Sequence, residues 1–225
     1  MKLSEDTVNV LKNFSTINQS LQVKPGNVLK TISPLKTVFV EATVSETFPK
    51  EAAVYDLNKL LAKVSLYKEA ELDFGDGKLH ITTESRKKND SISYCSPKVI
   101  VTPPEKPISI GEADCSFSLS QEDLDWMRKS AGISGSPNFV FESDGDTITF
   151  TATDVKDDAA DQSTIDIGSG NGTKFKVVMK VENFKLMEGS YDVSVAKKGL
   201  AQFKNKNTPI NYYIAIEAAA STFGE

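Results

Sequence analysis

A repeat that spans half of the chain constrains the fold more than any single motif does. An amphipathic segment near residue 4 recurs in the second half at a constant offset, so that Ser4 corresponds to Ser120. Leu11 likewise corresponds to Met127. Internal repetition of this kind indicates two similar domains within the 225 residues, each of a usual size for its own hydrophobic core.

The first half predicts two helices among short strands. Ser4 is a suitable N-cap, and the spacing after it predicts an apolar stripe made of Val8, Leu11, Phe14 and Ile17. A second, shorter helix is expected to start at Asp56. Strands are expected at residues 21–23, 28–32, 37–44, 71–74, 78–82 and 91–95. The first two strands are expected to pair through a turn at Pro25 and Gly26.

The second half repeats this plan after a proline-rich connector at about residues 96–110. Helices are predicted at residues 120–131 and 181–187, and strands between and after them, including residues 163–167, 174–179 and 211–218. The expected fold is therefore α+β, with domains at residues 1–108 and 109–225. Each domain should pack two helices on antiparallel sheets.

The composition excludes several classes of protein. A formal net charge of -5 argues against a broad basic surface that grips nucleic acid by phosphate neutralisation. No apolar run is long enough for a membrane span, and the first residues lack a signal-peptide pattern, so we expect an intracellular protein. Cys95 and Cys115 are too few for a disulfide framework.

The sequence also lacks the patterns of common catalytic sites. His80 is the only histidine, and no cysteine or carboxylate pattern completes a triad or a zinc site around it. The glycine run at residues 168–174 lacks the ending of a phosphate loop. Asp157, Asp158 and Asp161 lack calcium-loop spacing. We therefore predict no catalytic residue, metal or cofactor, and no enzyme activity.

Motifs in a fixed order link the chain to one family. They are Lys2-Leu3-Ser4, Leu11-Lys12-Asn13-Phe14, Thr16-Ile17-Asn18, Tyr55-Asp56-Leu57-Asn58, Asn183-Phe184-Lys185 with Gly189 and Tyr191, Ala196-Lys197, and Asn211-Tyr212. Together they resemble the sliding clamp of T-even-like tailed bacteriophages, the processivity factor of the phage replicative DNA polymerase. The likeness is dense over the first helix, thin over the second half and nearly absent from residues 65–174.

This resemblance implies a DNA-clamp fold, a closed homotrimeric ring of six domains, and two helices from each domain in the lining of the central hole. Such a ring encircles duplex DNA without sequence specificity and tethers the phage DNA polymerase for processive synthesis. An ATP-dependent clamp loader and late-transcription factors are further expected partners, and the place of action is the cytoplasm of the infected bacterial host.

The resemblance also gives the cations of the helices a possible role. Lys12 matches the family's first-helix lysine and Lys185 its fourth-helix lysine, whereas the helix positions alone suggest Lys59, Lys63, Arg128 and Lys129. Weak phosphate contacts from these residues would let a ring slide. The alternative interpretation is that they are ordinary solvated charges.

Two protein-binding surfaces are predicted. A head-to-tail ring must join an edge of the first domain to an edge of the second, which we assign to residues 91–95 and 163–167. The expected interface residues are Ile92, Tyr94, Cys95, Ile165 and Ile167. An apolar pocket for partner peptides is expected from Val99, Val101, Pro103, Pro104, Ile108 and Phe223. These six residues could instead merely cover the gap between the domains.

A function of another class stays open at this level. A phage structural or scaffold protein with duplicated domains, which binds protein and no DNA, would also fit the repeat. A small-molecule enzyme has almost no support from the residues.

Overall fold

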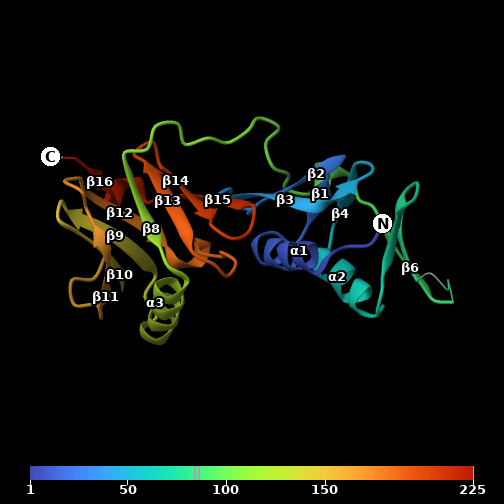
Figure 1. Ribbon diagram of the computed structural model, residues 1–225, viewed down its shortest axis with the longest axis horizontal. Helices are drawn as coiled ribbons and strands as arrows, with labels where there is room; N and C mark the ends of the chain where they lie inside the picture. Colours follow the sequence, from blue (N-terminus) through green and yellow to red (C-terminus); the bar gives the residue numbers. More distant parts are fainter. Residues whose placement is uncertain (84, 86, 225) are drawn as a thin grey trace. The chain divides into compact units, whose positions relative to one another are not determined.

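The chain forms two compact units in a computed structural model that describes residues 1–83, 85 and 87–224. The units are Met1–Lys106 and Pro107–Glu225. The division lies inside the proline-rich residues 96–110, which contain one 3-10 turn, Pro97–Val99. Each unit combines helix with antiparallel sheet (Figure 1), as the repeat predicts.

The first unit contains helices α1 (Glu5–Ile17) and α2 (Leu57–Ser65), which contact each other (Figure 1). Both begin at the predicted caps. Ser4 Oγ accepts a hydrogen bond from Thr7 N (3.2 Å), and Asp56 Oδ1 accepts one from Lys59 N (2.9 Å). These bonds satisfy backbone donors that lack a partner within the helix.

The buried faces differ slightly from the predicted stripes. On α1 the buried residues are Thr7, Val10, Leu11, Phe14 and Ile17. Val8 is only half-buried, because the buried face is centred between Val10 and Phe14. On α2, Leu57 and Leu60 are buried, as expected.

The strands of the first unit are β1 (Leu21–Val23), β2 (Gly26–Ile32), β3 (Val38–Phe48), β4 (Ala52–Val54), β5 (Glu71–Phe74), β6 (Lys78–Thr82) and β7 (Asn89–Ser93). β5, β6 and β7 form one antiparallel sheet in that order, close to the prediction. β2 pairs with β3.

The predicted pairing of residues 21–23 with residues 28–32 is wrong. β1 pairs instead with β4, in a register that sets Leu21 opposite Val54. All three residues of β4 are buried, so this strand supplies an apolar partner for Leu21 and Val23. Gly26, with φ 116°, turns the chain away from β1 and into β2.

The second unit contains helix α3 (Gln121–Ser134), whose N-cap is Ser120, as predicted. Its strands are β8 (Cys115–Leu119), β9 (Asn138–Asp144), β10 (Thr147–Thr153), β11 (Ser163–Ser169), β12 (Lys174–Lys180), β13 (Tyr191–Ala196), β14 (Leu200–Asn205), β15 (Ile210–Ala215) and β16 (Thr222–Phe223). They form antiparallel pairs in the orders β11-β10-β9-β12-β16 and β15-β14-β13-β8. The sequence did not indicate β8 or β16.

The predicted helix at residues 181–187 is wrong. The structure has one 3-10 turn, Val181–Asn183, followed by extended chain. Phe184 is buried, with its ring centroid 4.8 Å from that of Phe139 and 5.3 Å from that of Phe203. Arg128 Nη2 donates hydrogen bonds to Phe184 O (2.8 Å) and Leu186 O (3.1 Å). Side-chain packing and Arg128 therefore replace the bonds of a helix, and the described residues contain three α-helices rather than the four expected.

Candidate DNA-facing, subunit and partner surfaces

Helix α1 presents a polar face that includes Lys12. Glu5, Asn9, Lys12 and Thr16 are exposed on the side opposite the buried stripe. Strand β3 holds the start of this helix in place. Glu46 Oε1 accepts a hydrogen bond from Ser4 N, and Glu46 Oε2 accepts one from Thr7 Oγ1. The carboxylate thus complements the positive end of the helix dipole.

The environment of Glu46 lowers its pKa. Burial alone would raise the pKa of this carboxyl, but the hydrogen bonds from Thr7 and Ser4 outweigh burial and bring the pKa from 4.5 to about 2. Glu46 is therefore a carboxylate at neutral pH, and it fixes the direction in which α1 presents Lys12.

The two predicted lysines of α2 lie in different environments. Lys59 is exposed. Lys63 Nζ pairs with Asp90 Oδ1 of β7, and Tyr67 Oη donates to Asp90 Oδ2 (3.0 Å). The hydrogen bond from Lys63 lowers the pKa of Asp90. Because Asp90 offsets the charge of Lys63, Lys59 is the stronger candidate of the two for a phosphate contact.

The second unit likewise separates its predicted cations by environment. Lys129 is exposed on α3, whereas the guanidinium of Arg128 binds the carbonyls of Phe184 and Leu186. Lys185 is exposed, but it lies on extended chain and not on a fourth helix. Within the described part of the chain, the ion pairs do not involve Lys12, Lys59 or Lys129.

Two apolar residues on the exposed face of α3 were not predicted. Trp126 is 48% exposed and Ile133 is 87% exposed. They lie opposite the buried residues Leu124 and Met127, so a helical projection of residues 121–134 could have identified them. This face of α3 is therefore mixed, with Lys129 between two apolar side chains.

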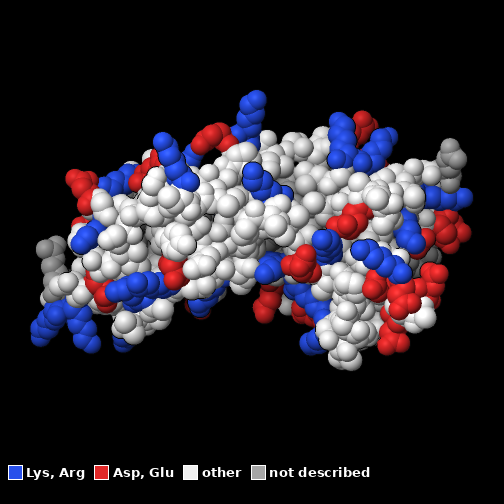
Figure 2. Space-filling model, turned by 180° about the vertical axis from the view of Figure 1, so that it is seen from behind, with Lys and Arg blue, Asp and Glu red and all other residues white. Residues whose placement is uncertain are grey.

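The surface charges are dispersed. Figure 2 shows lysines and arginines interspersed with acidic side chains over the face in view, as expected for a formal net charge of -5. Equilibrium attachment to DNA through such a surface should be weak and sensitive to salt.

The predicted interface strands both lie at the outside of their sheets. β7 is the outer strand of the order β5-β6-β7, and β11 is the outer strand of the order β11-β10-β9-β12-β16. Ile92, Ile165 and Ile167 are half-buried. Tyr94 and Cys95 lie just beyond the end of β7 and are half-buried as well.

The environment of Tyr94 distinguishes it from the other predicted interface residues. Its hydroxyl is buried and has no hydrogen-bond partner within residues 1–83, 85 and 87–224. Burial raises the pKa of this hydroxyl, and the nearby Asp73 and Asp76 raise it further.

The six residues predicted for a partner pocket are only partly brought together. Pro103 and Pro104 line a pocket of about 190 Å³ with Gln22, Lys24, Pro25, Val28, Lys30 and Glu105. Val28 is 39% exposed and is an apolar residue of this pocket that the sequence did not indicate.

The other predicted pocket residues lie elsewhere. Val99 is exposed, and the carbonyl of Val101 accepts a hydrogen bond from Asn18 Nδ2 (3.1 Å). Ile108 belongs to the second unit. Phe223 lies in β16, where it pairs with Phe175.

Signs of metal chemistry or of a membrane span were also sought. Among the described residues, no three His, Cys, Asp or Glu side chains gather as a metal site would require. Within the same residues, no helix has the length and apolar character needed to cross a bilayer.

Comparisons with known proteins assign both units to one group. Residues 4–102 match a family model described as DNA polymerase processivity factor, and residues 116–218 match one described as gp45 sliding clamp, C terminal. The chain is 30% identical over 223 residues to the sliding clamp of Vibrio phage KVP40, which covers 97% of this chain and 100% of the relative. It is 29% identical over 227 residues to the sliding clamp of Enterobacteria phage T4, which covers 97% of each chain.

A comparison with solved structures agrees at the level of the fold. The A. fulgidus PCNA bound to the C-terminal region of FEN-1 superposes with a TM-score of 0.70 at 13% identity, over 96% of this chain and 97% of that chain. The predicted two-domain clamp fold is thus confirmed, apart from the missing fourth helix.

Proposed function

The chain belongs to the sliding-clamp family of DNA polymerase processivity factors, and we propose that three copies form a ring that encircles duplex DNA and tethers the phage polymerase. The observation that carries the proposal is that each unit has one outer strand of its own, β7 in the first and β11 in the second. Two different edges on one chain suit a head-to-tail contact, which generates a closed ring when the rotation closes.

The residues facing DNA follow from this ring. Lys12, Lys59 and Lys129 supply the main phosphate contacts, because their side chains are exposed and outside the described ion pairs. Lys63 contributes less beside Asp90, Lys185 acts from extended chain, and Arg128 supports the 184–186 segment. Few and dispersed cations keep each contact weak, so that the ring slides without sequence preference while its closure prevents escape.

Partner proteins dock on the outside of the ring. The PCNA of A. fulgidus was solved with a C-terminal region of another protein bound, and an apolar pocket beside an extended proline-rich segment suits such a peptide. In this chain the pocket of Val28, Pro103 and Pro104 has that character. The occupants are C-terminal peptides of the phage DNA polymerase and of an ATP-dependent clamp loader, and late-transcription factors use the same surface. The clamp acts in the cytoplasm of the infected bacterial host and carries out no catalysis itself.

The mass in solution tests the ring. Light scattering at low micromolar concentration should give three times the chain mass of 24.5 kDa. A monomer at that concentration would contradict the proposed ring. A large, shell-like assembly would contradict it as well and would favour a structural or scaffold protein.

A further inference from the structure

We propose that two short segments cover the unused edges of the sheets that contain β7 and β11, so that copies of this chain associate only through those two strands. The edge-covering segments are residues 1–2, at the outer edge of β5, and residues 217–224, at the outer edge of β12. The partner whose approach they control is a second copy of the chain. This inference rests on the proposed ring and adds a reason why the ring has a single mode of closure.

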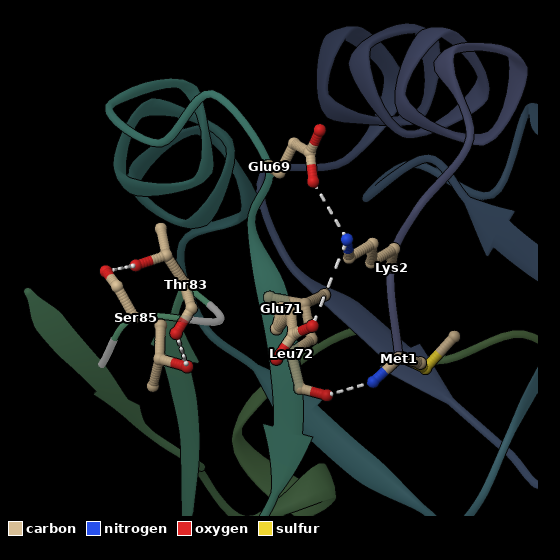
Figure 3. Close-up of polar contacts among 8 residues, drawn as sticks. Met1, Lys2, Glu69, Glu71, Leu72, Thr83 and Ser85 are labelled. Carbon is tan, nitrogen blue, oxygen red and sulfur yellow. Dashed lines mark hydrogen bonds and ion pairs between the residues drawn. The ribbon is translucent and has the colours of Figure 1, made fainter.

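The first edge-covering segment lies along β5 (Figure 3). Met1 N donates a hydrogen bond to Leu72 O (2.6 Å), and Leu72 N donates one to Met1 O (2.7 Å). Lys2 forms an antiparallel bridge with Glu71. Its Nζ lies 2.9 Å from Glu69 Oε2 and 4.0 Å from Glu71 Oε1. Backbone bonds and ion pairs therefore both hold this segment on the edge that β6 leaves free.

The second edge-covering segment follows β12. Gly224 N donates to Lys174 O (3.1 Å), and Glu217 N donates to Val178 O (2.8 Å). Between them, Thr222 is paired with Lys176. Val178 N donates to Ser221 Oγ (3.0 Å), so a side chain completes the row where the backbone does not. Residues 174, 176 and 178, whose backbone groups point away from β9, thus all face a partner.

The opposite edge of each sheet is open. In antiparallel sheets successive residues direct their backbone groups to alternate sides. Since Leu72 faces Met1, this alternation and the printed registers direct the backbone groups of residues 89, 91 and 93 of β7 outward. The same reasoning from Val178 directs residues 164, 166 and 168 of β11 outward. No strand within the described residues pairs with either of these edges.

This asymmetry determines what a second copy can do. An exposed row of unpaired N–H and C=O groups is a template for a strand of another chain. Were the edges of β5 and β12 open as well, each chain would offer four such templates, and head-to-tail contacts would compete with pairings that do not close. Covering two edges leaves one donor edge and one acceptor edge per chain, which is the condition for a closed ring.

Deleting residues 218–225 tests the inference at β12, with sedimentation velocity over a series of micromolar concentrations as the measurement. We expect the weight-average mass of the truncated chain to rise above the wild-type value as the concentration increases. A truncated chain that is folded by circular dichroism and keeps the wild-type mass throughout would overturn the proposal.

A rescue variant identifies the edge responsible. Lys176→Pro in the truncated chain removes an outward N–H of β12 without removing a bond to β9, so it should return the mass to the wild-type value. Continued association of this double variant would place the contact elsewhere and overturn the proposal. If the truncation unfolds the chain, the full-length variants Thr222→Pro and Thr222→Ala provide the comparison. Only the proline, which cannot donate to β12, should raise the mass, and equal masses for these two variants would overturn the proposal.

The outcomes separate this inference from the proposed function. A wild-type chain that is monomeric would refute the ring. The difference in mass between the wild-type and truncated chains would still decide whether residues 217–224 cover β12.

Discussion

Single residues decide where α1 begins and how it is held. Glu46, on a strand distant in sequence, accepts hydrogen bonds from Ser4 N and from Thr7 Oγ1 at the first turn of the helix. Ser4 was predictable as a cap because its chemistry is local. Glu46 was not, since nothing near it in sequence indicates that β3 passes the start of α1.

Replacing Glu46 should destabilise the first unit in a pH-dependent way. The pKa of Glu46 in the folded protein, about 2, lies below its ordinary value of 4.5. The stabilisation is therefore complete above about pH 4.5 and is lost as the pH falls toward 2. Glu46→Gln should lower the free energy of unfolding by about 2 kcal/mol at neutral pH, and by less as the pH approaches 2.

Denaturant titrations over this pH range measure the difference. Glu142→Gln, a change at an exposed strand position, is the matched control and should alter stability little. A loss for Glu46→Gln that stays constant between neutral pH and pH 2 would contradict the assignment.

Arg128 and Lys129 are neighbours with different expected roles. Arg128→Ala leaves the carbonyls of Phe184 and Leu186 without their donor, so it should lower the free energy of unfolding by about 1–3 kcal/mol. Lys129→Ala should leave stability unchanged but weaken DNA binding and reduce the salt slope by about 1. Thermal unfolding and salt-dependent binding to duplex DNA check both, and the reverse pattern would refute the division of roles.

At the scale of elements, local signals predicted most of the helices and hairpins, whereas non-local pairings escaped. Ser4, Asp56 and Ser120 fixed three helix starts. The β1–β4 pairing escaped because the turn signal at Pro25 and Gly26 suggested a nearer partner. The helix predicted at residues 181–187 failed because tertiary packing of Phe184 and the bonds from Arg128 override the local pattern.

The register of β11 shows where a proline should break the proposed interface. The backbone N–H of residue 166 faces outward, whereas that of residue 165 faces β10. Asp166→Pro should therefore shift the protein from trimers toward monomers and keep its fold, while Asp166→Ala, which retains the N–H, should remain trimeric. Light scattering at low micromolar concentration gives the result. A trimeric Asp166→Pro variant would exclude β11 from the contact.

The pocket of Pro103 and Pro104 gives a separate prediction. Val28→Asp places a carboxylate in its apolar part, so it should abolish clamp-dependent stimulation of the phage DNA polymerase and leave the trimer intact. Val99→Asp is the matched control, because Val99 is exposed and lies outside this pocket. Equal loss of stimulation in both variants, or in neither, would place the peptide elsewhere.

At the scale of the whole molecule, an acidic chain can act on DNA if its hold is topological rather than adhesive. The net charge of -5 and the dispersed cations provide little equilibrium affinity. The half-length repeat predicted the two units, and the comparisons confirm the clamp family across nearly the whole chain. Ring closure and the positions of the DNA-facing lysines could not be settled from one chain, because both depend on contacts with other copies.

Retention on DNA of different topology tests encirclement most directly. The protein is assembled on a nicked circular duplex with its clamp loader and ATP, the loader is removed, and bound protein is measured before and after one cut linearises the circle. We expect the clamp to stay on the circle and to leave the linear molecule by sliding off its ends, unless both ends are blocked. Equal retention on the circle and on the open linear duplex would contradict encirclement.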